Sequence, residues 1–305
     1  MDKVIITAAV NGNRTEKPGG PAIPATPQEI AEDARRCHQA GATVVHFHAR
    51  DPQTRFSTAD KAVFAETIAR IRRNGDMLVE TSTGLGPRID PVTRRPLIDP
   101  DTRSTVKPSE AERLTLLEID PPQDLGAIAM GSMNMFNPVY PEAVVFINSD
   151  HYITESLRRL SAQPRIGFQF EIFDLGFLFS VDRLVRRGLL DRQNPRFWLN
   201  YILGFGGLPP EPRFLELIRD EGKRLFPDAL WGGLAPAQEH WTIQQAAADL
   251  GADVMRTGLE DTIHLPDGTV TDTNAQLVEA LVALVRRSGR EPATPAEARV
   301  MLGLA

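Results

Sequence analysis

Two histidines one residue apart, His46 and His48, are the side chains whose type and spacing point most directly to chemistry. They lie in "TVVHFHARDP", after a β-branched run and before Arg-Asp-Pro. In a strand, residues i and i+2 point to the same face, so both imidazoles would project together. Two imidazoles bind one divalent ion at about 2.0–2.1 Å when a third ligand converges from another strand. The alternative is a pair of core histidines with satisfied hydrogen bonds, and the spacing alone leaves both open.

A cluster of ionisable residues near the other end of the chain supplies a candidate third ligand. "DVMRTGLEDTIHLPDG" places Glu260 and Asp261 after a strand-like run, with Arg256 near the end of that run. In a closed eight-stranded barrel the last strand lies next to the first and near the second, so Glu260 could reach the same ion. Asp261 would then be a general base that Arg256 orients. The alternative is an ordinary helix start, where acidic residues are common.

Weaker candidates end other strand-like runs. The "TSTG" motif ends a strand-like run with hydroxyls able to bind a substrate carboxylate, and Ser82, Thr83 and Gly84 are its candidate substrate contacts. "GSMNMFNP" presents Asn134. Glu171 in "FQFEIFD" is a carboxylate on an apolar run, so it needs a partner or a functional reason.

Short β-branched runs alternate with longer helical patterns along the whole chain. The predicted strands are 3–10, 42–49, 77–83, 125–130, 165–173, 197–204, 229–235 and 252–258. Helical patterns between them include 26–41, 58–75, 181–190, 211–226 and 242–251. This alternation implies parallel strands with right-handed crossovers, and eight units predict an α/β fold of the (β/α)8 TIM-barrel type. No G-x-G-x-x-G follows the first strand, which argues against a dinucleotide fold.

The chain has 305 residues, of which 42% are hydrophobic and 24% charged, as in ordinary compact proteins. We expect a single TIM-barrel domain over 1–305 with a C-terminal helical extension. The stretch 84–108 is rich in Pro and Arg and is predicted to be an irregular insertion. In a barrel it would lie at the C-terminal face, where active sites are built.

The net charge and the single cysteine limit which binding partners and which cellular compartment we expect. A net charge of −6 leaves no basic footprint for nucleic acid. The single cysteine, Cys37, cannot form an internal disulfide, which fits a reducing compartment. The start "MDKVIITAAV" does not resemble a signal peptide, and no apolar run approaches the roughly 20 residues of a membrane span. We therefore expect a soluble, cytoplasmic protein that does not contact membranes.

The motifs taken together are more specific than any one of them. "ITAAVNG", "PATPQEIAEDARRCHQAGATVVHFHARD", "TSTG", "GSMN", "FEIFDLG", "LGFGG" and "RTGLEDTI" occur in this order, and "ATPAEARVMLGL" follows near the C-terminus. This series resembles the β-keto acid cleavage enzymes, of the 3-keto-5-aminohexanoate cleavage type. The resemblance covers nearly the whole chain.

The resemblance implies a TIM barrel that binds one Zn²⁺ through His46, His48 and Glu260. It implies a transferase that condenses a β-keto acid with acetyl-CoA, giving acetoacetate and a new acyl-CoA. The family's Arg and Asp around the metal-binding glutamate match Arg256 and Asp261, and its substrate-binding serine matches Ser82. It further implies small-molecule partners and a homotetramer.

The chain departs from the family pattern at positions that contact the substrate. Arg14 stands where the named activity uses a glutamate to meet an ammonium group, although Glu16 lies two residues on. Ala127 replaces a usual Ser or Thr. We expect the same reaction class with a different β-keto acid, one whose anionic or neutral polar tail faces Arg14, because like charges buried together are unfavourable.

Three other functions remain open on the residues. An amidohydrolase-like metal hydrolase would need further histidine ligands on middle strands, and the remaining histidines lie outside the predicted strands: His38, His151, His240 and His264. A metal-dependent aldolase or lyase that uses no CoA is a second alternative. A non-catalytic barrel that binds a metabolite is the third, and the retention of the five metal-site and base residues argues against it.

Overall fold

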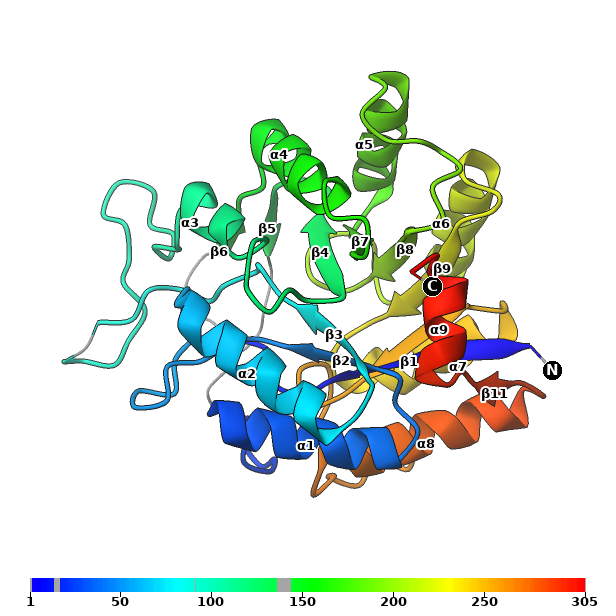
Figure 1. Ribbon diagram of the computed structural model, residues 1–305, viewed down its shortest axis with the longest axis horizontal. Coiled ribbons are helices and arrows are strands. Elements are labelled where there is room, and N and C mark those ends of the chain that lie inside the picture. The colour runs from blue at the N-terminus through cyan, green and yellow to red at the C-terminus, as the bar shows by residue number, and fades with distance from the viewer. Residues whose placement is uncertain (1, 14–16, 91, 136–143, 305) are drawn as a thin grey trace.

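Eight parallel strands close into a barrel in the part of the chain that the computed structural model describes, residues 2–13, 17–90, 92–135 and 144–304 (Figure 1). The strand order is β10-β9-β8-β7-β4-β3-β2-β1, and β1 pairs with β10 to complete the ring. The strands are β1 (Lys3–Ala9), β2 (Val44–Phe47), β3 (Leu78–Thr81), β4 (Leu125–Ala129), β7 (Gly167–Ile172), β8 (Phe197–Ile202), β9 (Leu230–Leu234) and β10 (Val254–Thr257). The predicted TIM barrel is confirmed, and all eight predicted strands overlap observed ones.

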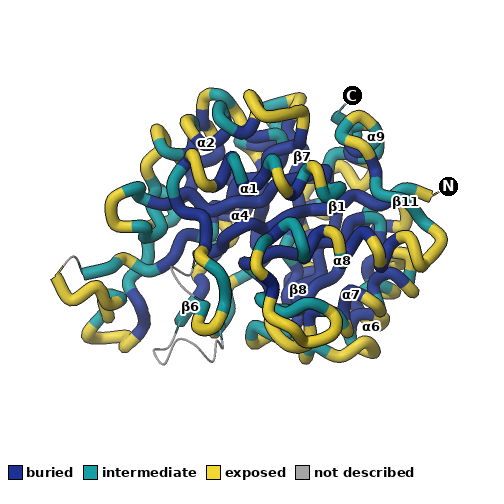
Figure 2. The backbone as a smooth tube through the Cα atoms, turned by 90° about the horizontal axis from the view of Figure 1, so that it is seen from below, coloured by how far each residue is buried: buried dark blue, intermediate teal, exposed yellow. Residues whose placement is uncertain are grey.

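Helices surround the barrel and leave the strands buried at the centre, as the dark tube in Figure 2 shows. They are α1 (Pro27–Gln39), α2 (Lys61–Asn74), α3 (Glu110–Thr115), α4 (Asp150–Ser161), α5 (Leu175–Arg186), α6 (Pro212–Leu225), α7 (His240–Asp249) and α8 (Asn274–Arg287). The start of α1 is fixed by a capping box in which Thr26 and Glu29 bond each other's backbone N–H. Gly41, at φ +110°, follows its end.

The interior of the barrel is apolar at its N-terminal end. Side chains that alternate into the barrel from six strands form one buried cluster: Ile5, Val44, Leu78, Leu125, Trp198 and Val254. Ala298 and Leu302 from α9 (Pro295–Met301) and its end pack onto this cluster. Helix α9 therefore closes the N-terminal end of the barrel, opposite the end where β/α barrels place their chemistry.

The next interior layer is polar. Two residues further along the strands, the buried side chains are Thr7, His46, Glu80, Gln169, Asn200 and Arg256. Most of them line one small cavity above Trp198 and Val254. Barrel interiors are usually filled by branched apolar residues, and buried polar groups are costly unless they are paired. The side chains of this layer are therefore better explained by a functional role than by core packing.

Three additions complete the described chain. Strands β5 (Met133–Met135) and β6 (Val144–Phe146) form an antiparallel hairpin, and β11 (Glu291–Pro292) pairs with β1. The insertion 84–108 extends from the C-terminal end of the barrel, on the left of Figure 1, and contains isolated bridges but no helix in its described part. No described helix is long and apolar enough to cross a membrane.

Two predicted boundaries differ from the structure. Helix α5 begins at Leu175, well before the predicted 181–190, because the Asp174 side chain accepts a hydrogen bond from the Phe177 N–H and caps it there. The β5–β6 hairpin was not predicted, since its three-residue strands carry no readable alternation.

Candidate metal centre

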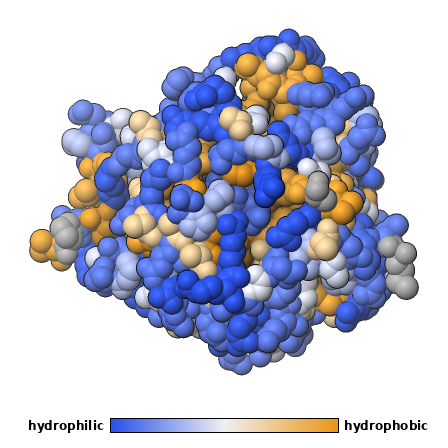
Figure 3. Space-filling model, viewed as in Figure 1, coloured by the Kyte–Doolittle hydropathy of each residue, from blue (hydrophilic) through white to orange (hydrophobic). Residues whose placement is uncertain are grey.

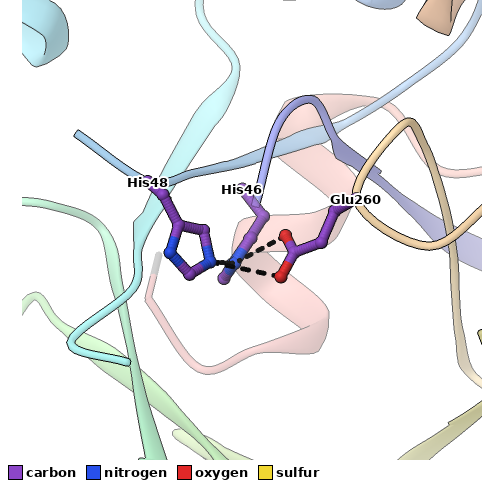
Figure 4. Close-up of side chains that lie close together, drawn as sticks. All are labelled: His46, His48 and Glu260. Carbon is purple, nitrogen blue, oxygen red and sulfur yellow. Dashed lines mark hydrogen bonds and ion pairs between the residues drawn. The ribbon is translucent and has the colours of Figure 1, made fainter. Parts of the chain in front are cut away.

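The side chains of His46, His48 and Glu260 converge at the C-terminal mouth of the barrel (Figure 4). The two Nε2 atoms lie 3.4 Å apart, His46 Nε2 lies 3.3 Å from Glu260 Oε2, and His48 Nε2 lies 3.2 Å from Glu260 Oε1. Ligands held at about 2.0–2.1 Å in tetrahedral geometry are about 3.3–3.4 Å apart. The two imidazole nitrogens and the two carboxylate oxygens therefore lie close to the spacing that one small divalent ion such as Zn²⁺ requires.

The far nitrogen of each imidazole is held by an oxygen acceptor. His46 Nδ1 lies 2.9 Å from Glu80 Oε2, and His48 Nδ1 lies 2.9 Å from Asn13 Oδ1. An acceptor at Nδ1 places the ring proton there and leaves the Nε2 lone pair directed at the centre. Metal-bound histidines in proteins are oriented in this way. Both rings are thus set up as ligands.

Two glycines allow Glu260 to reach the histidines. Gly258, at φ +150°, approaches β1 so closely that a Cβ there would lie 2.1 Å from the Ala9 carbonyl oxygen. The Glu260 N–H then donates to that same carbonyl at 3.1 Å. Gly12, at φ +67°, leaves room for the Glu260 side chain, since a Cβ would lie 2.6 Å from its Cγ. Barrel closure and these two turns bring residues 212 apart in sequence into one site.

The electrostatics of the centre favour a bound cation. Burial would raise the pKa of Glu260, but Arg256, His48 and His46 hold it well below its usual range, so the carboxylate is ionised. Burial would lower the pKa of His46, yet the Glu260 charge raises it to about 9. The pKa of His48 is lowered, chiefly by burial. Positive charge next to Glu260 is therefore stabilised, and a divalent ion supplies it.

Arg256 and Asp261 form a buried bidentate pair beside the ligands. Arg256 Nε lies 3.0 Å from Asp261 Oδ2 and its Nη2 lies 2.9 Å from Asp261 Oδ1. The same Nη2 lies 3.1 Å from Glu260 Oε2. The predicted Asp–Arg contact is present, and it fixes the Asp261 carboxylate in one orientation next to the candidate metal ligands.

Glu171 on β7 adds a second carboxylate on the inner face of the barrel. No described side chain bonds to it. Burial raises the pKa of Glu171 to about 7, although His46 and Arg256 partly oppose this. Near neutral pH the group can therefore exist in either protonation state.

The "TSTG" motif lies beside the histidines but has several structural contacts. Ser82 Oγ accepts from the Gly84 N–H at 3.0 Å, and Thr83 Oγ1 accepts from the Tyr152 hydroxyl at 2.9 Å. The Gly84 carbonyl accepts from Asn13 Nδ2 at 2.6 Å, and Asn13 in turn orients His48. The motif is thus connected to the metal centre through one amide.

Among the described residues, one predicted substrate contact is not brought to the centre. Asn134 lies exposed on β5, and no contact in the described part of the chain links it to the histidines. Arg14 and Glu16 lie outside the described residues. Glu80, Asn13 and Gly12 were not predicted, and only Glu80, a carboxylate in an apolar run, carried any signal in the sequence.

The remaining histidines serve other contacts. His38 Nδ1 lies 3.0 Å from the Ala42 carbonyl oxygen, and buried His240 bonds Ala235 and Thr257. Among the described residues, none of the four joins the His46–His48–Glu260 group. The additional ligands that an amidohydrolase-like site needs are therefore missing from the described chain.

Comparisons with known proteins relate nearly the whole chain to one family. The family model described as beta-keto acid cleavage enzyme matches residues 3–304. The chain is similar to the 3-oxoadipate:acetyl-CoA acetyltransferase of Cupriavidus necator, at 29% identity over 98% of this chain and 94% of that protein. It is also similar to the 3-keto-5-aminohexanoate cleavage enzyme of Fusobacterium nucleatum subsp. nucleatum, at 28% identity over 100% and 99%.

Solved structures with low sequence identity share the barrel. ObcA, in its apo structure, matches with a TM-score of 0.67 at 16% identity, over 92% of this chain. This chain spans 65% of the length of ObcA. The type I 3-dehydroquinate dehydratase of Clostridium difficile matches with a TM-score of 0.54 at 11% identity, over 94% of each chain. These likenesses concern the fold alone.

Proposed function

The chain belongs to the beta-keto acid cleavage enzyme family, whose members are acetyl-CoA-dependent β-keto acid cleavage transferases, and from this premise we propose how its own residues carry the reaction. We propose that it condenses a β-keto acid with acetyl-CoA and releases acetoacetate and a new acyl-CoA. The observation that carries the proposal is the bidentate Arg256–Asp261 pair directly beside three converging ligand atoms. This arrangement combines a cation site with an oriented base.

His46, His48 and Glu260 would hold the ion, and two nitrogens with one carboxylate favour zinc. When bound, zinc supplies Lewis-acid polarisation of a substrate oxygen. Glu80 and Asn13 keep both Nε2 lone pairs directed inward. Arg256 balances the charge of the two adjacent carboxylates, which otherwise would repel each other in a buried site.

In the proposed reaction Asp261 takes a proton from the carbon between the keto and carboxylate groups. That carbon attacks the acetyl carbonyl of acetyl-CoA, forming a carbon–carbon bond while the carbon–sulfur bond breaks and CoA thiolate leaves. The thiolate then attacks the original keto carbon. The bond between the original keto carbon and the carbon that Asp261 deprotonated then breaks, which releases the new acyl-CoA. The acetoacetate carbanion takes its proton back from Asp261.

For the substrate contacts we retain the Ser82 hydroxyl as a donor near the centre, with Gly84 supporting it, because the Gly84 N–H donates to Ser82 Oγ. Thr83 instead supports the motif, because its hydroxyl is bonded by Tyr152. Asn134 has an exposed amide that a ligand could engage. The hypothesis that Arg14 faces the substrate tail stays a prediction. The two similar proteins named above act, by their names, on substrates with different tails, so the tail is where this chain is proposed to differ.

The test of the function is a substrate panel. Purified protein is incubated with acetyl-CoA and β-keto acids whose tails are cationic, neutral or anionic, and products are identified by mass spectrometry. We expect acetoacetate and a new acyl-CoA in equal amounts, with His46→Ala as the inactive control. Cleavage that proceeds without acetyl-CoA, or no product from zinc-loaded protein with any substrate, would disprove the proposal.

The metal assignment has its own test. Elemental analysis should find about one zinc per chain in the wild type. His46→Ala and Glu260→Gln should each lose the metal, because each removes one of only three protein ligands. Lys61→Met, at the exposed start of α2, is the control and should keep it. Retention of stoichiometric zinc by both ligand variants would contradict the assignment.

A further inference from the structure

Two cationic side chains share one aromatic ring at the mouth of the barrel. Lys107 Nζ lies 5.0 Å from the centroid of the Phe146 ring, and Arg113 Cζ lies 5.4 Å from the same centroid. Arg113 Cζ also lies 4.2 Å from the ring centroid of Tyr152. Lys107 is the next-to-last residue of the insertion 84–108, and Phe146 ends β6. We call this group the Lys107 cluster: Lys107, Arg113, Phe146 and Tyr152.

No carboxylate of the described chain neutralises these two charges. The Arg113 guanidinium is buried and donates to three neutral oxygens: Thr83 O at 2.8 Å, Ile147 O at 2.8 Å and Asn148 Oδ1 at 2.7 Å. Lys107 has the Phe146 ring and no ion pair among the described residues. The nearby acids of α3 are bonded elsewhere, Glu110 to Ser149 and Glu112 to Arg88 and Ser109.

Two cationic groups without a carboxylate partner destabilise the folded protein unless an anion binds between them or beside them. Partial burial of the ammonium group and, to a smaller extent, the neighbouring Arg113 charge lower the pKa of Lys107 to about 8. Buried charges in proteins are normally paired, because desolvation without a partner is expensive. A cation–π contact offsets only part of that cost. The Lys107 cluster thus has the electrostatics of a binding site for an anion.

The cluster lies directly behind the "TSTG" motif. A Cβ on Gly84 would lie 3.8 Å from Phe146 Cζ, and the Thr83 carbonyl accepts from Arg113. Gly84 is itself bonded to Asn13, which orients the metal ligand His48. One aromatic ring and one amide therefore separate Lys107 from the residues around the metal centre. A small molecule that contacts both the metal centre and the Lys107 cluster would carry an anionic group at the end remote from the metal centre.

We propose that Lys107, with Arg113 as its positioning residue, binds an anionic end group of a substrate at the barrel mouth. The group is a carboxylate or a phosphate, and it has two sources: a distal carboxylate on the β-keto acid tail, or the phosphates of CoA. The inference rests on the proposed function and makes it specific, because it assigns a substrate contact to a residue of the insertion.

The experiment compares Lys107→Met with the wild type on a matched pair of β-keto acids, one ending in a carboxylate and one ending in a methyl group. If the tail carries the anion, kcat/KM falls at least about tenfold for the carboxylate-tailed acid and is unchanged for the neutral one. If CoA carries it, KM for acetyl-CoA rises about tenfold with both acids. Lys107→Arg should retain most of either effect, and Lys61→Met should change neither.

A binding measurement keeps the inference separate from the reaction. The melting temperature of zinc-loaded wild type should rise with glutarate or with CoA, and Lys107→Met should lose most of that rise. Without ligand, Lys107→Met should melt no lower than the wild type, since it removes an unpaired buried charge. Active wild type with Lys107→Met unchanged in kinetics and in both melting shifts would overturn the inference alone. Inactive wild type with an intact melting shift would overturn only the proposed function.

Discussion

At the scale of single residues, the side of each imidazole that faces away from the centre decides its role. Glu80 and Asn13 accept from Nδ1 of His46 and His48, so each Nε2 lone pair faces Glu260. A histidine pair without these acceptors could equally present N–H groups to each other and repel a cation. The difference between two core histidines and two ligands therefore lies in the acceptors behind them.

Asp261→Asn tests the base and leaves the metal site intact. An asparagine oxygen still accepts from Arg256, but the amide cannot take a proton from carbon. We expect stoichiometric zinc and a loss of kcat of about 10²-fold or more. Zinc content and steady-state kinetics are measured on the same preparation. If kcat is undiminished, another group must be the base.

Glu171 should make stability depend on pH. Its pKa is raised from 4.5 to about 7, so the folded protein disfavours the ionised form relative to the unfolded chain. The resulting destabilisation is absent below about pH 4.5, grows as pH rises, and is complete above about pH 7. Urea denaturation of metal-free wild type and Glu171→Gln should show the variant gaining relative stability across that range. A difference in the free energy of unfolding that is constant with pH would contradict the assignment.

The convergence of His46, His48 and Glu260 could be predicted because their relative positions follow from strand period and barrel closure. His46 and His48 share a face by alternation, and Glu260 follows the strand that pairs with β1. Glu80 is the register partner of His46 on β3, but the sequence does not show register. Asn13 and Gly12 act through the backbone conformation of a loop, which no periodicity reports.

At the scale of elements, the eight strands could be predicted because each is a short, mostly buried and mostly apolar run between helical patterns. Helix α5 was predicted to begin too late because its first turn, "LGFLFS", is apolar all round and continues the character of β7. Its true start depends on the Asp174 cap. Local sequence propensity therefore predicts the strands well. It predicts helix starts less well where the flanking residues are apolar.

Helix α9 should stabilise the whole barrel without affecting chemistry. Leu302 is buried against the apolar cluster at the N-terminal end of the barrel. Leu302→Ala removes buried methyl groups and should cost about 2–4 kcal/mol in the free energy of unfolding, with kcat/KM unchanged. Val300, which is 67% exposed on the same helix, gives the control Val300→Ala, for which we expect no change.

The same measurement tests the prediction of one domain over 1–305. If the C-terminal extension belongs to the barrel, Leu302→Ala should shift a single unfolding transition as a whole. A separate early transition, with the barrel unaffected, would show that the extension unfolds independently and would contradict that prediction.

At the scale of the whole molecule, stability and chemistry occupy opposite ends of the barrel. The N-terminal interior is apolar and closed by α9, while the layer above it carries His46, Glu80 and Arg256. The polar layer contributes less to folding stability than an apolar layer would, and the apolar N-terminal end of the same barrel compensates for this. The insertion extends from the C-terminal end (Figure 1), so it is where this chain can vary its contacts with substrates and with other molecules.

The insertion also exposes apolar side chains that a lone chain in water would not favour. Val92 is 88% exposed, Leu97 38% and Ile98 37%, and nearby Ile147 is 57% exposed. Figure 3 shows hydrophobic surface at the left tip of the molecule, where the insertion extends in Figure 1. Projecting apolar groups of this kind are typical of interfaces. We therefore expect the insertion to pack against another copy of this chain in a homo-oligomer, a tetramer by the family resemblance.

Light scattering on a sizing column tests this expectation. The wild type should elute as an assembly of 33.7-kDa chains, and the double variant Val92→Asp with Leu97→Asp should shift to a smaller mass, because two carboxylates cannot be buried in an apolar contact. Leu217→Asp, at a 47% exposed position on α6, is the control and should leave the mass unchanged. A monomeric wild type would refute oligomerisation, and an unchanged mass in the double variant would place the interface away from the insertion.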